Sequence, residues 1–262
     1  MPTLPMSESC DRYLAPWLLS PFAKDLASRL ARLKTGPLLE FAAGTGTLTR
    51  AIALAMPPGM TIVATDPEPP KLDTTSTGTP LARVIWKRAD PAALPFPDAS
   101  FGIITCHFGI ASMADRAPAL REARRVMMPG GRFVFSVPGP LRHNPAAECV
   151  HMALAALYPD NTPTFLAQQM HGYADEDMID NDLTAAGFTD AMYTTVDLPL
   201  EVPASDVSLG YCLGTPLRRE LNDDVPAKIG EALFKTAEAL SIRFGSNVIE
   251  TTMRATVVSA SA

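Results

Sequence analysis

The segment that most constrains this chain is a glycine turn that directly follows a short apolar strand. Residues 37–49 read Pro-Leu-Leu-Glu-Phe-Ala-Ala-Gly-Thr-Gly-Thr-Leu-Thr. Small residues at such a turn let the backbone pass close to a ligand, and here they are Ala42, Ala43, Gly44 and Gly46. A second apolar run, Met60–Thr65, ends in Asp66, twenty residues after Gly46. An acidic residue at a strand tip accepts hydrogen bonds from both ribose hydroxyls of a nucleoside, so the sequence predicts a nucleoside-cofactor site.

Two classes of cofactor use this layout, and the spacing of the glycines separates them. A dinucleotide site needs Gly-x-Gly-x-x-Gly, because the third glycine lets the helix pack close to the strand and leaves the helix N-terminus to the pyrophosphate. A register that starts at Gly44 puts Thr49 at the third position, and one that starts at Ala42 puts Thr47 there. Neither register fits, so a nicotinamide-dependent oxidoreductase is kept only as an alternative.

The turn instead resembles the first motif of class I S-adenosylmethionine-dependent methyltransferases, in which an acidic residue is followed by Gly-x-Gly-x-Gly. Glu40 stands at the acidic position, and Gly44 and Gly46 match the second and third glycines. Ala42 replaces the first glycine, which is a mild departure. Taken alone, this motif also fits an ordinary tight turn between a strand and a helix.

A longer stretch, residues 84–138, closely resembles the ubiquinone/menaquinone-biosynthesis type of these methyltransferases. That family carries Asp-Ala-x-x-Leu-Pro-Phe, a strand that begins Ser-Phe-Asp, and Arg-Val-Leu-Lys-Pro-Gly-Gly before its fifth strand. This chain has Asp-Pro-Ala-Ala-Leu-Pro-Phe from Asp90, Ser-Phe-Gly from Ser100 and Arg-Val-Met-Met-Pro-Gly-Gly from Arg125. Several motifs in the same order make a specific signal. The main departures are Gly102 in place of Asp and Met128 in place of Lys.

The resemblance implies a Rossmann-like, doubly wound α/β sheet of seven strands, mostly parallel with an antiparallel edge strand, that binds S-adenosylmethionine. In such sheets the ligand lies at the carboxyl ends of the strands, where the strand order reverses. By resemblance, Gly44 and Gly46 line the methionine part of the cofactor. Asp66 holds the ribose, and Asp90 accepts a hydrogen bond from the adenine amino group.

The remaining roles also follow from the resemblance. Ala89 and Pro91 would flank the adenine, with Pro67 on its other face. Cys106 and His107 would border the sulfonium, and Glu40 would order the amino group of the cofactor. The expected cofactor-binding residues are therefore Tyr13, Glu40, Ala42, Ala43, Gly44, Gly46, Asp66, Pro67, Ala89, Asp90, Pro91, Cys106 and His107.

Apolar runs alternate with segments of helical periodicity, which predicts a parallel sheet with right-handed crossovers. Strands are expected at 37–41, 60–65, 83–88, 101–107 and 132–137, and an antiparallel edge pair at 188–197 and 248–259. Helices are expected at 7–17, 21–34, 47–56, 68–73, 116–128, 145–157, 205–213 and 226–243, and another between a cap at Asp175 and a stop at Gly187. We interpret Arg121, Arg124 and Arg125 as the solvated face of the 116–128 helix.

Methyl transfer from a sulfonium is an in-line displacement, in which the protein mainly aligns the nucleophile and excludes water. A base helps only when the acceptor is a hydroxyl, a protonated amine or a carbon acid. His107 is the best-placed candidate, either as this base or as a group that orients the acceptor. Of the other histidines, His151 fits a structural role, whereas His171 precedes a helix cap and is a weaker candidate for reaching the acceptor.

Composition narrows the substrate class. The chain has 262 residues, a net charge of −6 and four cysteines without metal or redox spacing. The acidic balance argues against nucleic acid, and no metal site is expected. No apolar run is long enough for a transmembrane helix, and no basic region precedes an apolar N-terminal stretch as in a secretory signal. We therefore expect a cytoplasmic enzyme that acts on a small molecule; a homodimer is left open.

We expect one domain over residues 1–262, with an N-terminal helical cap at 1–34 and a helical lid at 139–175. The second segment follows the fifth strand and is too long and too apolar for a simple loop; its apolar residues include Leu141, Met152, Leu154, Leu157, Phe165 and Met170. The N-terminal helix that carries Tyr13 and Trp17 should close the other side. The acceptor atom, oxygen, nitrogen or carbon, is left open. A non-catalytic S-adenosylmethionine-binding protein is a further alternative, because Ala42 and Gly102 depart from the family pattern.

Overall fold

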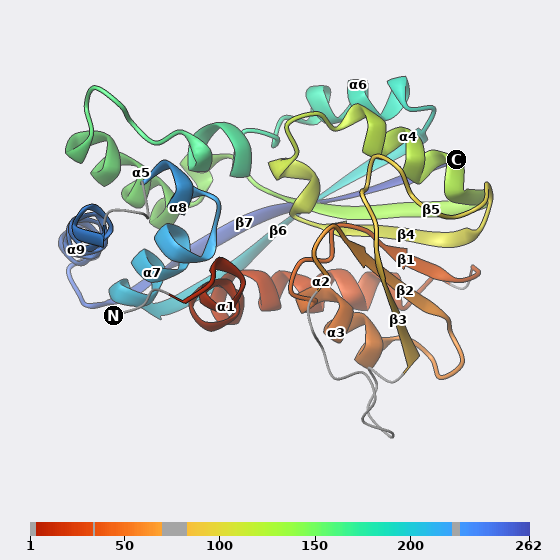
Figure 1. Cartoon of the computed structure of the whole chain (residues 1–262), viewed down its shortest axis with the longest axis horizontal. Helices are drawn as coiled ribbons and strands as arrows, with labels where there is room; N and C mark the ends of the chain where they lie inside the picture. Colours follow the sequence, from red (N-terminus) through yellow and green to blue (C-terminus); the bar gives the residue numbers. More distant parts are fainter. Residues whose placement is uncertain (1–3, 34, 70–82, 222–225) are drawn as a thin grey trace. The chain divides into compact units, whose positions relative to one another are not determined.

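The computed structural model describes residues 4–33, 35–69, 83–221 and 226–262, and its contacts group the chain into two compact units (Figure 1). The sheet unit comprises Phe22–Pro138, Ala174–Val196 and Ala255–Ala262. The helical unit comprises Met1–Pro21, Gly139–Tyr173 and Asp197–Arg254. The prediction of a single domain from 1 to 262, with a cap and a lid, stays a prediction.

In the described residues the strands form one seven-stranded sheet in the order β3-β2-β1-β4-β5-β7-β6. They are β1 (Leu38–Glu40), β2 (Ile62–Asp66), β3 (Val84–Arg88), β4 (Phe101–His107), β5 (Met127–Pro138), β6 (Thr189–Pro203) and β7 (Val248–Ser261). The first five strands pair in parallel, and β7 pairs antiparallel with β5. The expected fold class is thus confirmed. The strand order reverses between β1 and β4, which places the expected ligand crevice at the carboxyl ends of these two strands.

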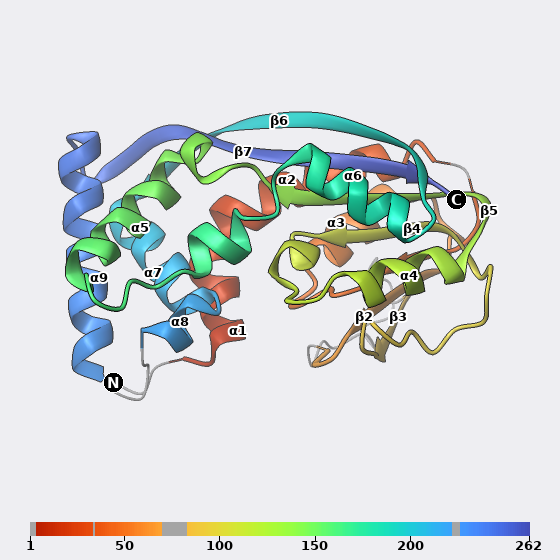
Figure 2. The same ribbon diagram turned by 90° about the horizontal axis from the view of Figure 1, so that it is seen from above.

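Helices cover both faces of the sheet in the sheet unit. The two views agree that α2 (Ser20–Leu30) and α3 (Thr47–Ala55) lie on one face, and α4 (Ala117–Val126) and α6 (Glu176–Ala185) on the other (Figures 1 and 2). Parallel strands buried on both faces read as continuous apolar runs, as β1 and β4 do. Asp175 caps α6 by accepting a hydrogen bond from the Met178 N–H at 3.0 Å, as the sequence predicts.

The helix expected at 116–128 ends two residues early, at Val126, and Met127 already belongs to β5. Pro129 disfavours the helical conformation of Met128, the residue before it, so the helix could not have reached 128 as expected. β6 and β7 are also longer than expected, ending at Pro203 and Ser261. Most of the helix expected at 68–73 lies outside the described residues.

Gly102, where the related family usually has Asp, is required here by close backbone packing. A Cβ built at this position would lie 2.3 Å from the carbonyl oxygen of Thr35 and 2.9 Å from the backbone nitrogen of Gly36. Both contacts are with backbone atoms, which cannot rotate away as a side chain can. The departure from the family pattern therefore accompanies a close approach of residues 35 and 36 to the start of β4.

Replacing Gly102 by Ala should accordingly lower the free energy of unfolding by roughly 1–3 kcal/mol, the usual cost of overpacking a filled site. Urea denaturation of the variant measures this loss. Gly230→Ala is the matched control, because its Cβ would meet nothing within 4 Å and it lies inside α9 (Pro226–Phe244). That control should leave stability unchanged or raise it; a Gly102→Ala variant as stable as the original protein would contradict the packing argument.

The helical unit gathers α1 (Met6–Ser9), η1 (Cys10–Leu19), η4 (Leu141–His143), α5 (Pro145–Leu157), η5 (Phe165–Met170), α7 (Ala204–Gly214), α8 (Leu217–Glu220) and α9. η1 packs on α7, and its Trp17 ring meets Tyr211 edge to face with centroids 5.4 Å apart. α5 and α7 both pack on α9. None of the helices in the described part of the chain is long and apolar enough to cross a membrane.

Candidate functional site

The glycine turn is fastened to the strands on both sides of β1. The Phe41 N–H donates to the Thr105 carbonyl of β4 at 3.1 Å, and the Ala43 N–H donates to the Thr65 carbonyl of β2 at 3.0 Å. Ala42 between them has a φ of 50°, in the left-handed region. Such a conformation costs an L-residue about 1–2 kcal/mol, which explains why the family places glycine at this position.

Gly46 is the residue at which the turn becomes α3. Its φ is 84°, and a Cβ built on it would come within 2.9 Å of the Trp86 ring. Trp86 lies on β3, so this indole covers the turn from the side and leaves no room for a side chain at position 46. Backbone conformation and packing therefore both require glycine here.

Asp66, at the tip of β2, lies directly against the turn. Its Oδ2 accepts a hydrogen bond from the Gly44 N–H at 2.8 Å, and its Oδ1 accepts one from the Glu68 N–H at 2.9 Å. Each carboxylate oxygen has a second lone pair, so these bonds leave capacity for two hydroxyl donors of a ligand. The structure thus brings together the two features that predicted the nucleoside site.

Glu40 ends β1 and is completely buried beneath the turn. Its Oε2 accepts a hydrogen bond from the Thr49 hydroxyl of α3 at 2.6 Å, which ties the strand to the helix. Burial raises the pKa of the Glu40 carboxyl to about 8, against the lowering effects of the Thr49 bond and the Arg50 charge. In the structure Glu40 supports the turn from below, and its predicted ordering of the cofactor's amino group stays a prediction.

The raised pKa of Glu40 makes stability depend on pH. Below its ordinary value of 4.5 the carboxyl is neutral in both folded and unfolded chains, so burial has no ionisation penalty. As the pH rises from 4.5 toward 8, the unfolded chain loses this proton and the folded chain keeps it. The free energy of unfolding should therefore fall by up to about 1.4 kcal/mol per pH unit from this group.

Urea denaturation of the original protein and of Glu40→Gln between pH 5 and 8 measures this contribution. Gln is neutral at every pH and can still accept the Thr49 hydrogen bond, so the variant should show a flatter dependence. Identical slopes for the two proteins would contradict the buried, neutral carboxyl.

Of the expected adenine-binding residues, Ala89, Asp90 and Pro91 follow β3, and Pro67 follows Asp66 at the end of β2. The Ala89 N–H donates to the Asp66 carbonyl at 3.2 Å, which joins the ends of β2 and β3. Ala89 and Pro91 are buried, whereas Asp90 and Pro67 are exposed. Asp90 Oδ1 accepts a hydrogen bond from the Ala92 N–H at 2.9 Å, so the carboxylate is held at the start of the loop that follows β3.

His107 closes β4, at the same edge of the sheet. Its Nδ1 lies 2.7 Å from the hydroxyl of Ser136, which faces it across the β4–β5 pair, and its ring stacks on Phe108 with centroids 4.2 Å apart. These two contacts, one polar and one apolar, help to hold the ring in place. Sequence reasoning missed Ser136, although its place on the strand next to β4 was a usable signal.

The Ser136 contact decides what His107 can do. If Nδ1–H donates to the Ser136 hydroxyl, Nε2 carries a lone pair and can accept a proton from an acceptor molecule. If the hydroxyl donates instead, Nε2 carries the hydrogen and can only donate. Cys106, the neighbouring residue, is completely buried, and burial raises the pKa of its thiol to about 12, so the thiol is neutral; its expected place beside the sulfonium stays a prediction.

Two other predicted positions belong to the helical unit. Tyr13 lies on η1, with the Arg12 guanidinium 5.3 Å from its ring, and its contact with the cofactor stays a prediction. His171 is buried, with its Nδ1 2.7 Å from the Gly139 carbonyl oxygen, and burial lowers its pKa to about 4. A histidine that stays neutral in this way supports a structural role.

Comparison with known proteins agrees with the family that the sequence motifs resemble. Residues 39–135 match the family described as the methyltransferase domain. The ubiquinone/menaquinone biosynthesis C-methyltransferase UbiE of Geobacter sulfurreducens is 38% identical over 110 residues, which cover 39% of this chain and 43% of that protein. The demethylmenaquinone methyltransferase of Paenarthrobacter aurescens is 35% identical over 166 residues, 60% of this chain and 63% of that protein. This chain thus spans less than two thirds of either relative.

Solved structures share the fold at low sequence identity. The YcgJ protein of Bacillus subtilis superposes with a TM-score of 0.57 and 18% identity, covering 92% of this chain and 98% of that one. Phosphoethanolamine N-methyltransferase 2 of Haemonchus contortus, in complex with S-adenosyl-L-methionine, gives a TM-score of 0.56 and 14% identity over 97% of this chain and 56% of that one. These likenesses show the fold alone.

Proposed function

We propose that this chain, whose residues 39–135 match the methyltransferase domain family, transfers a methyl group from S-adenosylmethionine to a small-molecule acceptor. The observation that carries the proposal is the contact of Asp66 with the glycine turn, 2.8 Å from its Oδ2 to the Gly44 nitrogen. The Asp66 carboxylate can accept hydrogen bonds from the ribose of a nucleoside bound there. The turn, which has only small residues, leaves room for the methionine part attached to the 5′ carbon.

The residues around the turn supply the other parts of the site. Ala89, Asp90 and Pro91 are proposed to receive the adenine, and His107 lies at the strand end next to β1, on the side where the sulfonium is expected. The cofactor brings an electrophilic methyl group that is already activated by positive charge. The protein then aligns the acceptor with it and keeps water away.

The names of the relatives and the net charge of the chain support a proposal for the class of acceptor. Both curated relatives carry names of quinone-precursor methyltransferases, so a demethylated menaquinone precursor is the first acceptor to test. The net charge of −6 favours a small molecule over nucleic acid. A cytoplasmic location and a homodimer remain expectations of the same proposal.

A thermal-shift comparison tests the cofactor choice directly. S-adenosylhomocysteine should raise the melting temperature, and the rise should grow with the logarithm of its concentration above the dissociation constant, because a ligand that binds only the folded protein stabilises it. NAD at the same concentrations should leave the melting temperature unchanged. A shift with NAD and none with S-adenosylhomocysteine would favour the oxidoreductase alternative, whereas cofactor binding without turnover on any acceptor would favour the non-catalytic one.

The lid is part of the same proposal. In the structure, residues 139–173 contain η4, α5 and η5, and Leu154, Phe165 and Met170 are buried within the helical unit. A methyl donor needs a dry cover, which we propose these helices provide together with residues 10–20. Hydrogen exchange in both segments should slow when S-adenosylhomocysteine and an acceptor are added. Protection of 139–175 that is strong from the start and unaffected by ligands would reject the lid.

A further inference from the structure

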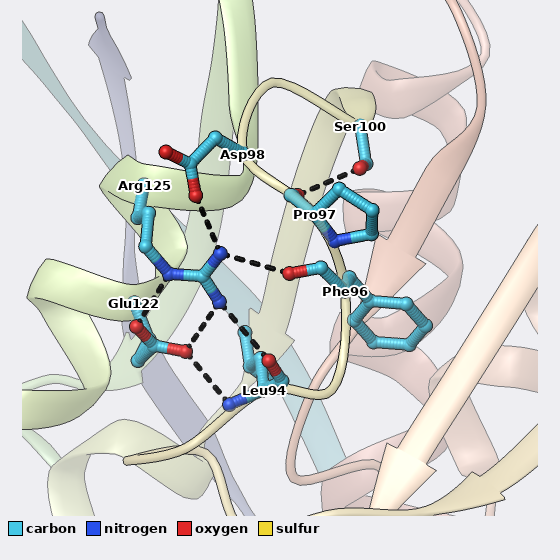
Figure 3. A network of polar contacts seen from close by, with 7 residues as sticks. All are labelled: Leu94, Phe96, Pro97, Asp98, Ser100, Glu122 and Arg125. Atoms are coloured by element: carbon cyan, nitrogen blue, oxygen red, sulfur yellow. Dashed lines mark hydrogen bonds and ion pairs between the residues drawn. The ribbon is translucent and has the colours of Figure 1, made fainter.

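Arg125, in the last turn of α4, holds the loop that follows Asp90 (Figure 3). Its Nη1 donates to the Phe96 carbonyl and to Asp98 Oδ1, both at 2.8 Å, and its Nη2 donates to the Leu94 carbonyl at 3.0 Å. The guanidinium therefore reaches this loop at alternate positions from 94 to 98. The interpretation of Arg125 as part of a solvated helix face holds only in part: its side chain is still 32% exposed, but nearby backbone carbonyls and two carboxylates take up its donors.

Glu122, one turn earlier on α4, completes the contact from the same side. Its two carboxylate oxygens accept from Arg125 Nε and Nη2, each at 2.7 Å, and Oε2 also accepts from the Leu94 N–H at 2.8 Å. The hydrogen bonds from Arg125 hold the pKa of Glu122 below its usual range. Leu94 is thus bound through both its carbonyl and its N–H, which fixes its backbone in place.

The end of the loop is fastened to the same helix through the backbone. The Ala99 N–H donates to the Arg125 carbonyl at 3.0 Å, and the Ser100 N–H donates to the Val126 carbonyl at 2.8 Å. Phe96 adds an edge-to-face contact with Phe101, with centroids 5.0 Å apart. Residues 94–100 are therefore attached to α4 at both ends and in the middle of the segment.

The other end of the loop carries Asp90, and in the described part of the chain its own contacts are local. Its Oδ1 accepts from the Ala92 N–H, and its carbonyl accepts from the Ala93 N–H. A tight turn of this kind sets its own shape but not its position in the molecule. That position follows from β3 on one side and from the fastened residue Leu94 on the other.

We propose that Arg125 and Glu122 are positioning residues for adenine recognition: they hold residues 89–93 where the Asp90 carboxylate meets the adenine amino group. This inference rests on the proposed function, which places the adenine at residues 89–91. Neither side chain touches the cofactor. Both act through the loop backbone, so their loss should change which base is preferred and not only how tightly a nucleoside binds.

Two ligands make this distinction measurable. S-adenosylhomocysteine has the amino group that Asp90 accepts from, and S-inosylhomocysteine has an oxygen in its place. The original protein should prefer the first ligand in calorimetry by roughly tenfold or more, the usual worth of a hydrogen bond to a charged group. Arg125→Ala should lose most of this preference, and amide exchange at residues 91–98 should become faster in the ligand-free protein.

The matched control is Arg121→Ala, an exposed arginine on the same helix one residue before Glu122. It should keep both the ligand preference and the protection of the loop. Arg125→Lys retains the charge but not the forked geometry, so it should recover only part of the preference. If Arg125→Ala fails to fold, Glu122→Gln provides the same test with little change in shape.

The outcomes distinguish a failure of the positioning role from a failure of the proposed methyltransferase function. An Arg125→Ala protein that still prefers the adenine ligand and still protects residues 91–98 would overturn the positioning role. Equal affinity of the original protein for both ligands would overturn it as well. If the original protein binds neither ligand, the proposed function itself fails, whatever the exchange data show.

Discussion

Replacement of His107 by Ala should lower the rate of methyl transfer by about 10²–10⁴-fold if the acceptor has to lose a proton, the usual effect of removing a general base. The affinity for S-adenosylhomocysteine should change little, because the ring is held by Ser136 and Phe108 at the edge of the site. Single-turnover assays give the rate, and calorimetry gives the affinity.

The neighbouring variants separate a base from an orienting group. His107→Gln can donate and accept hydrogen bonds but cannot take up a proton near neutral pH. Ser136→Ala removes the 2.7 Å contact to Nδ1 and leaves the imidazole itself in place. A base predicts a large loss for Gln and a smaller one for Ser136→Ala. Turnover of His107→Gln close to that of the original protein across pH would show that orientation suffices.

Replacement of Asp66 by Ala should weaken cofactor binding by about 1.5–3 kcal/mol, because the ribose hydroxyls of a bound nucleoside lose a charged partner. That range corresponds to roughly 10–150-fold in the dissociation constant. The variant also loses the bonds from the Gly44 and Glu68 N–H groups, which hold the turn. Its melting temperature without ligand should therefore be measured together with its affinity.

Asp66→Asn is the control for this second effect. The amide oxygen can still accept a hydrogen bond from a backbone N–H, but the group is neutral and has only one acceptor atom. Its affinity should lie between those of the original protein and Asp66→Ala, with a smaller loss of stability. Undiminished affinity of Asp66→Ala for S-adenosylhomocysteine would remove the ribose assignment.

The local patterns of the sequence were sufficient to predict the parallel strands of the sheet and the glycine turn. Apolar runs located the five parallel strands, and the small residues from Ala42 to Gly46 together with Asp66 located the site. These features depend on neighbours within one strand–turn–helix unit, so spacing along the chain reveals them. The match over residues 39–135 confirms the family resemblance that their motifs indicated.

Contacts between segments that are distant in the chain could not be predicted from the sequence. An arginine in the last turn of a helix normally suggests a solvated side chain, and nothing local shows that the carbonyls of Leu94 and Phe96 lie within reach of Arg125. Gly102 departs from the family pattern because the backbone of Thr35 lies beside it, a contact that the sequence does not reveal. The grouping of residues 139–173 with the N-terminal segment likewise depends on tertiary packing, which no periodicity encodes.

Label transfer tests the proposed activity most directly. The protein would be incubated with S-adenosylmethionine that carries a deuterated methyl group, first with a demethylated menaquinone precursor and then with a metabolite extract of the source cell. Mass spectrometry should find a product that carries the labelled methyl group, formed with the original protein and reduced with Asp66→Ala, and strongly reduced with His107→Ala where the acceptor has to lose a proton. No labelled product from any acceptor, together with no binding of S-adenosylhomocysteine in calorimetry, would contradict methyl transfer by this chain.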